Sequence, residues 1–186
     1  MSTDVRITIA EYDRMISAGE FEPQEEHHVE LIHGEIHEMN PINPPHAEAL
    51  NYLMYWSIDN SPRDQVRVRN QESLGLPELE SVPQPDLFWV RKKNYSRQRP
   101  TNEDVFLVIE VSDSTLAYDR GEKAELYAEA GIQDYWIVNV IDRAVEVYRD
   151  PMGGRYRQIQ SYGESDKVSP LAFPDLQLKV ADLWQA

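Results

Sequence analysis

Cysteine is absent from the 186-residue chain. Its absence excludes disulfide bonds, zinc sites built on thiolates and a cysteine nucleophile. Long apolar runs are missing as well, and no stretch approaches the length needed to span a bilayer. Residues 1–10 also lack the apolar segment of a signal peptide. We therefore expect a soluble, cytoplasmic protein that has no membrane partner.

Basic residues are in the minority, with 18 lysines and arginines against 33 aspartates and glutamates and a formal net charge of -15. Such a charge repels phosphate backbones and disfavours non-specific binding to nucleic acid. Residues 91–100 differ, because "RKKNYSRQRP" contains five bases and no acid. This pattern is typical of a solvated loop, but a basic loop around an aromatic residue also suits contact with a nucleic-acid strand. The candidates for that contact are Arg91, Lys92, Lys93, Tyr95, Arg97 and Arg99.

The order of expected helices and strands indicates one domain, residues 1–186, whose 41% hydrophobic content suits a single core. Helices are expected at about 9–18, 45–58 and 119–130. Strands are expected at about 66–69, 86–90, 105–112 and 134–140, with hairpins at 29–39 and around 151–154. Helices mixed among strands and hairpins indicate an α/β or α+β fold with a sheet of mixed direction.

We divide this domain into three parts. An N-terminal helix and hairpin occupy 1–45, the core occupies 46–140, and further strands occupy 141–186. Candidate functional residues concentrate in the core.

Glu110 is the first of these candidates. It interrupts "VFLVIEVS", residues 105–112, which is otherwise apolar enough for a strand buried on both faces. Burying an ionised carboxylate costs several kcal/mol unless a cation or hydrogen-bond donors accompany it. Asp86 is a second carboxylate, at the start of another apolar run, although a Pro-Asp pair also commonly marks a turn. Two acids held close together need a proton or a metal ion between them, and Mg²⁺ accepts one or two carboxylates.

Lys123 is the cation that the sequence offers. We expect a helix with Asp119 as its N-cap and Gly131 just past its end. On a helical wheel Lys123 falls in the apolar stripe with Leu126, away from the glutamates. A helix that directly follows a strand turns its apolar stripe towards the sheet, which makes Lys123 a candidate neighbour of Glu110. The alternative is an ordinary contact between Lys123 and Asp119, four residues apart.

Several segments together resemble the Uma family of restriction-endonuclease-like proteins in the PD-(D/E)xK superfamily. These segments are "VELIHGEIHEM", "PQPD", "VIEVSDST" and "YDRGEKAELYAEAGIQDYW", and the resemblance spans nearly the whole chain. It implies a restriction-endonuclease-like core in which Asp86 is the motif aspartate and Glu110 the motif acid. The position two after Glu110, usually a lysine, is Ser112 here. The resemblance implies that Lys123 takes the place of this lysine.

The resemblance also implies a function. The implied function is that of a metal-dependent endonuclease that hydrolyses DNA phosphodiester bonds. The resemblance implies that Asp86, Glu110 and the backbone carbonyl of Val111 hold the Mg²⁺ or Mn²⁺ ion. A homodimer is expected from nucleases of this kind. Glu30 matches a family acid that would complete the metal site, or it is a solvent-facing strand glutamate. His46, Gln71 and Ser112 are further candidates for the site.

Other interpretations of the same residues remain open. The serine at position 112 and the acidic composition also suit a catalytically inactive module that binds a protein or a nucleic acid. A glycosidase also uses a pair of carboxylates, which Asp86 and Glu110 would supply, although Lys123 and the family resemblance disfavour this. His33 and His37 would bind a transition metal or form the polar outer face of a strand.

Overall fold

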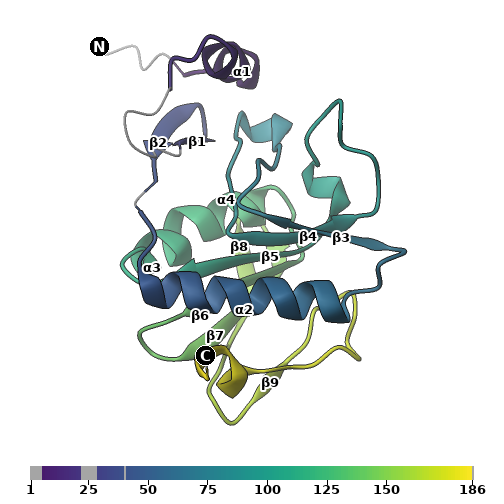
Figure 1. Ribbon diagram of the computed structural model, residues 1–186. Coiled ribbons are helices and arrows are strands. Elements are labelled where there is room, and N and C mark those ends of the chain that lie inside the picture. Colours follow the sequence, from purple (N-terminus) through teal and green to yellow (C-terminus); the bar gives the residue numbers. More distant parts are fainter. Residues whose placement is uncertain (1–5, 22–28, 40, 186) are drawn as a thin grey trace.

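The computed structural model describes residues 6–21, 29–39 and 41–185. Residues 1–5, 22–28, 40 and 186 of the expected single domain lie outside the described residues. A six-stranded sheet in the order β3-β4-β5-β6-β7-β8 forms the centre (Figure 1). β5 pairs with β6 in parallel, and the other neighbours pair antiparallel. This mixed sheet, flanked by helices, confirms the fold class.

The strands of the main sheet are β3 (Val66–Asn70), β4 (Leu87–Arg91), β5 (Val105–Ser112), β6 (Asp134–Asn139), β7 (Ala144–Met152) and β8 (Arg155–Tyr162). Two small hairpin-like pairs are β1 (Val29–Ile32) with β2 (Glu35–Glu38), and β9 (Lys167–Val168) with β10 (Leu178–Lys179). The helices are α1 (Ile9–Ser17), α2 (Pro44–Asn60), α3 (Leu116–Tyr118) and α4 (Ala124–Glu129). Shorter turns are η1 (Pro77–Leu79), η2 (Asn102–Asp104), the π-helical η3 (Asp119–Lys123) and η4 (Val180–Trp184). Within the described residues, no helix combines the length and the apolar character that crossing a membrane requires.

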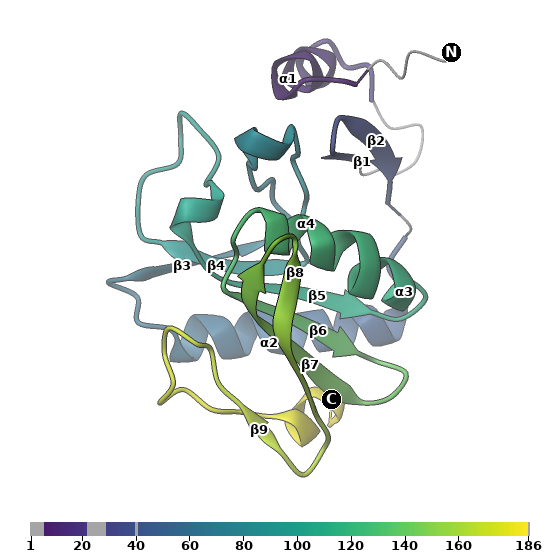
Figure 2. The same cartoon turned by 180° about the vertical axis from the view of Figure 1, so that it is seen from behind.

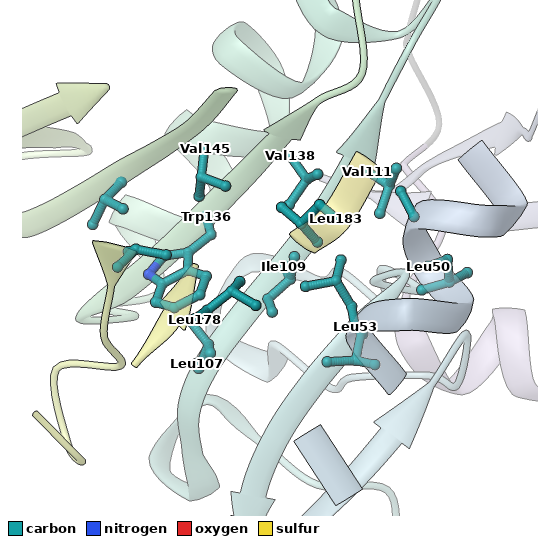
Figure 3. Packing of buried hydrophobic residues seen from close by; sticks show 14 of the residues in the cluster. Leu50, Leu53, Leu107, Ile109, Val111, Trp136, Val138, Val145, Leu178 and Leu183 are labelled. Carbon is teal, nitrogen blue, oxygen red and sulfur yellow. The ribbon is translucent and has the colours of Figure 1, made fainter. Parts of the chain in front are cut away.

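Helix α2 covers one face of the sheet (Figure 1). Asn43 caps its first turn by accepting a hydrogen bond from the backbone N–H of His46 at 3.1 Å. Leu50 and Leu53 pack against Ile109 of β5, and the C-terminal segment adds Leu183 to the same core (Figure 3). Burial of these apolar side chains fixes the helix against the sheet.

The second helical layer, α3-η3-α4, covers the opposite face of the sheet (Figure 2). Because side chains alternate along a strand, Val108 and Glu110 face this layer while Ile109 and Val111 face α2. The layer connects β5 to its parallel neighbour β6, as a crossover in a mixed sheet requires. Glu110 therefore lies beneath the helical segment that carries Lys123.

Asp119 is not the helix N-cap that the sequence pattern predicts. Helical backbone begins at Leu116, and Asp119 lies inside the segment with φ -68° and ψ -36°. Its buried carboxylate instead accepts hydrogen bonds from the hydroxyls of Ser112 and Thr115 at 2.6 and 2.7 Å. The predicted end of the helix is confirmed, because Gly131 follows α4 with a positive φ of 74°.

Helix α1 and the β1–β2 hairpin lie together beyond one edge of the main sheet (Figure 1). Thr8 and Glu11 form a capping box at the start of α1. Tyr12, Leu31 and Val82 form a small core beneath the hairpin, and the backbones of Leu31 and Val82 bond to each other. These contacts fix β1 against the loop that precedes β4, and so fix the position of Glu30.

Candidate active site

Lys123 occupies the centre of a buried ionic cluster. Its Nζ donates to Glu30 Oε2 at 2.6 Å and to Glu110 Oε1 at 3.1 Å. Only 3% of Lys123, 3% of Glu30 and 4% of Glu110 is exposed. The contact with Asp119 that we considered as an alternative is therefore not the interaction of this lysine, and Glu30 is not the solvent-facing glutamate of the other alternative.

Asp86 and Glu110 are joined through the backbone at the ends of adjacent strands. The N–H of Asp86 donates to Glu110 Oε2 at 3.1 Å, and the N–H of Val111 donates to Asp86 Oδ2 at 2.8 Å. Tyr127 of α4 donates its hydroxyl to Glu110 Oε1 at 2.7 Å. These bonds hold both carboxylates in fixed orientations at the edge of the pocket.

The charges of this cluster are strongly coupled. Burial raises the pKa of Glu110 to about 8, and Asp86 and Glu30 act in the same direction, against the effect of Lys123. Burial alone would lower the pKa of Lys123, but Glu110 and Glu30 raise it well above its ordinary value. Lys123 therefore stays an ammonium ion at neutral pH, and its charge offsets those of the buried acids.

His46 and Gln71 converge on the remaining oxygen of Asp86. Gln71 donates Nε2 to Asp86 Oδ1 at 3.3 Å, from a backbone position with a positive φ of 49°. His46 Nε2 lies 3.3 Å from the same oxygen, but it has no hydrogen-bond partner of suitable geometry among the described residues. Strained backbone and unpartnered buried nitrogen both occur at functional sites more often than elsewhere.

Ser112 does not line the pocket with Glu110. It is fully buried, and its hydroxyl donates to Asp119 at 2.6 Å. Burial raises the pKa of the Asp119 carboxyl, against the effect of the two hydroxyl donors from Ser112 and Thr115. The structure thus gives Ser112 a contact that holds the η3 turn over β5.

The side chains of Glu30, Asp86, Glu110 and Lys123 all line one cavity of about 330 Å³. Its other walls come from the hairpin, from the N-terminal end of α2 and from α3. Buried carboxylates beside an open cavity are typical of a site that binds a cation or a reacting group.

A hard divalent cation suits the donors of this cavity. Asp86, Glu110 and the carbonyl of Val111 are oxygen ligands, and Mg²⁺ needs few of them because it keeps several waters. In the described part of the chain, no three His, Asp or Glu side chains lie close enough to hold one ion. His33 and His37 accordingly form no such group, and each lies near a glutamate, Glu129 at 3.5 Å and Glu122 at 3.6 Å respectively.

The basic loop at 91–100 begins at the end of β4 remote from Asp86. Arg91 lies five residues along the chain, about 17 Å at the rise of a strand. Several of its side chains have partners within the protein: Lys92 bonds to the carbonyl of Arg63, Lys93 to Asp104, Arg99 to Asp13, and Tyr95 packs beneath Arg69. Its expected contact with nucleic acid stays a prediction.

Comparison with known proteins places the chain in a family. A family model described as "Putative restriction endonuclease", Uma2, matches residues 9–181. The chain belongs to the Uma2 family. A crystal structure of a "putative nuclease belonging to DUF820" from Anabaena variabilis ATCC 29413 superimposes with a TM-score of 0.69. The alignment covers 96% of this chain and 97% of that chain at 17% identity, so it shows a shared fold. Curated protein sequences give no match.

Family membership agrees with the resemblance drawn from the sequence and supports a nuclease-like function for the Uma2 chain. Two residues of the site were not predicted from the sequence. Tyr127, which bonds to Glu110, lies inside the predicted helix, and Tyr118, which lines the cavity, lies in the connection that precedes that helix. Tyr127 follows Lys123 by four positions, one helical turn, and this spacing was the available signal.

Proposed function

We propose that this Uma2 protein is an endonuclease that hydrolyses DNA phosphodiester bonds with the help of Mg²⁺ or Mn²⁺. One observation carries the proposal: a buried ammonium group, Lys123, is shared by Glu110 and Glu30 in the lining of a cavity that Asp86 also lines. Phosphodiester hydrolysis needs a positive charge near the phosphate and acids that hold a cation. The family supports the reaction class.

Asp86, Glu110 and the carbonyl of Val111 would hold the cation. When bound, a divalent cation lowers the pKa of a coordinated water molecule and polarises the phosphate. Lys123 would orient the attacking water and stabilise the negative charge that develops on the phosphoryl oxygens. Val111 and Asp86 contribute their N–H groups, which keep the two carboxylates in place before substrate arrives.

Glu30 acts through Lys123 in this proposal. Its Oε2 accepts from Lys123 at 2.6 Å and from the backbone N–H of Gln84 at 3.3 Å, which leaves it turned towards the lysine. Tyr127 supports Glu110 from the other side. The two acids and the tyrosine would hold the ammonium group and the metal-binding carboxylate in a reactive arrangement.

Cleavage of plasmid and single-stranded DNA in millimolar Mg²⁺ tests the proposal. Asp86→Ala, Glu110→Ala and Lys123→Ala should each reduce the rate by about 100-fold or more, as expected when charge stabilisation is lost. Lys179→Ala is the control, because this exposed lysine lies on β10, away from the cavity. Activity that survives all three substitutions would contradict the proposal.

The alternative function, a catalytically inactive binding module, predicts that the protein does not bind a metal ion at this site. Both oxygens of Glu110 already accept hydrogen bonds from protein donors, an arrangement that also suits a site without metal. Calorimetry distinguishes the nuclease from the inactive binding module, because a degenerate site should show no heat of binding with millimolar Mg²⁺ or Mn²⁺. The cytoplasmic location and the homodimer stay predictions, and light scattering would test the second.

A further inference from the structure

We propose that the cavity beside Asp86 and Glu110 receives one unpaired nucleotide, so that the substrate is a single strand or an unpaired segment of nucleic acid. This inference rests on the proposed nuclease function and specifies its substrate. It comes from the burial of the reactive groups and from the walls and the charge of the cavity.

The reactive groups that line the cavity are buried and do not lie on an open surface. Asp86 is 6% exposed, Glu110 4% and Lys123 3%. A phosphate must enter the cavity of about 330 Å³ to reach them. The backbone of a continuous duplex is held on the outside of a wide, stiff helix, whereas an unpaired strand bends and its nucleotides enter pockets singly.

One wall of the cavity is apolar and aromatic. Met39 and Ile42, which follow the hairpin, and Tyr118 of α3 line this wall. The ring of His37 lies 6.1 Å from the ring of Tyr118, and Ile42 is 48% exposed. Nucleobases stack on such surfaces irrespective of their sequence, and stacking is available only to a base that has left its duplex.

The lining of the cavity also carries buried polar atoms that have no partner among the described residues. Among the described residues, neither the hydroxyl of Tyr118 nor Nε2 of His46 makes a hydrogen bond, although both are buried. Both residues line the cavity. Buried polar atoms are normally paired, so a ligand that supplies hydrogen-bonding edges, such as a base or a ribose, accounts for them.

The charge of the cavity also favours a single strand. Lys123 is the one lysine or arginine among the described residues that line it, and Glu30, Glu38 and Asp119 are also present. Duplex DNA carries one negative charge for every ~1.7 Å of its axis, both strands counted, so an unpaired strand presents fewer charges to this acidic site. Repulsion is therefore weaker for the unpaired strand.

The test compares binding and cleavage of one fluorescent oligodeoxynucleotide as a single strand and as a duplex, with a single-stranded RNA of the same sequence as a third substrate. Fluorescence polarisation in Ca²⁺ measures binding, and cleavage in Mg²⁺ gives KM and kcat. The single strand should bind about ten-fold more tightly than the duplex, the size of effect that loss of one stacked base produces. The RNA shows whether the sugar contributes to recognition.

Variants of the wall test where the strand binds. Tyr118→Ala and Ile42→Ser should each raise KM for the single strand several-fold and change kcat little, while Tyr118→Phe should keep the stacking and the melting temperature, because the lost hydroxyl has no partner. Tyr55→Ala is the matched control, since Tyr55 is a 65% exposed tyrosine on α2 about 13 Å along the helix from His46. It should change neither constant.

The outcomes separate this inference from the nuclease proposal. If the protein cleaves the duplex and the single strand equally, and Tyr118→Ala and Ile42→Ser have no effect, the protein is a nuclease but the inference of an unpaired nucleotide in the cavity is wrong. A protein that binds the single strand through Tyr118 and Ile42 but cleaves nothing supports the inference and contradicts the nuclease proposal. Equal or tighter binding of the duplex also overturns the inference.

Discussion

Lys123 Nζ lies 2.6 Å from Glu30 Oε2, although 93 positions separate the two residues in the chain. Glu30 belongs to β1, outside the main sheet, and Lys123 belongs to the η3 turn over β5. The ion pair therefore connects the N-terminal hairpin to the helical layer and closes one side of the cavity. A π-helical turn such as η3 is rare and is often found at functional sites.

Replacing Lys123 should destabilise the fold strongly. Lys123→Met leaves Glu30 and Glu110 buried without a cation, which costs about 3–5 kcal/mol in comparable buried pairs. Urea unfolding of the metal-free protein measures the loss. Adding Glu30→Gln to Lys123→Met should recover part of it, because one of the two stranded charges is then removed. A loss below about 1 kcal/mol would mean that the pair is hydrated like a surface salt bridge.

The stability of the metal-free protein should fall as pH rises from about 4.5, the ordinary pKa of a glutamate, to about 8, the pKa of Glu110 in the folded protein. The folded pKa of Glu110 is raised to about 8, above the value of an unfolded glutamate, by burial and by neighbouring acids. Its contribution is therefore fully present below the unfolded pKa and is lost as pH rises through about 8. Thermal unfolding between about pH 6 and pH 9 should show the decline, and Glu110→Gln should flatten it. A decline of unchanged slope in Glu110→Gln would assign the effect to other groups.

Binding of a divalent cation should release a proton. Because burial and the neighbouring acids raise the pKa of Glu110 to about 8, an ion that binds this carboxylate competes with a proton, and Mn²⁺ affinity should rise with pH up to about 8. Calorimetry in two buffers of different ionisation enthalpy counts the released protons. Asp86→Asn should lower the affinity at every pH, while an affinity independent of pH would show that Glu110 is already ionised in the free protein.

Ser112 should act on stability and not on metal binding. Ser112→Ala removes one of the two hydroxyl donors to the buried Asp119 carboxylate and should cost about 1–3 kcal/mol of unfolding free energy. The Mn²⁺ affinity should stay at the wild-type value, because the serine does not line the cavity. Ser161→Ala, on the exposed edge strand β8, is the control and should leave both quantities unchanged. A large loss of affinity in Ser112→Ala would place the serine in the site.

Local patterns in the sequence were sufficient for most of the main sheet and for the position of Lys123. The apolar run around Glu110 predicted β5, because a strand that is buried on both faces consists almost entirely of apolar residues. The helical wheel placed Lys123 on the buried side, since 3.6 residues per turn fixes which side chains share a face. Both inferences use contacts between residues that are close in the chain.

Features that depend on distant contacts could not be predicted in the same way. The partner of Glu30 lies 93 positions away, and only the packing of the hairpin on Val82 brings the two together. Asp119 followed by Glu122 has the spacing of a capping box, but the preceding turn is already helical, so the pattern gave the wrong helix start. Ile58 ends the apolar helix predicted at about 45–58, yet it is 42% exposed, because the buried face of α2 runs through Ala49, Leu50 and Leu53.

A crystal structure of the protein soaked in Mn²⁺ and measured at the manganese absorption edge tests the metal site most directly. We expect one anomalous peak in contact with the carboxylates of Asp86 and Glu110 and with the carbonyl of Val111, with Lys123 Nζ still beside it. No peak at this position, with Glu110 bonded to Lys123 and Tyr127 instead, would contradict the account.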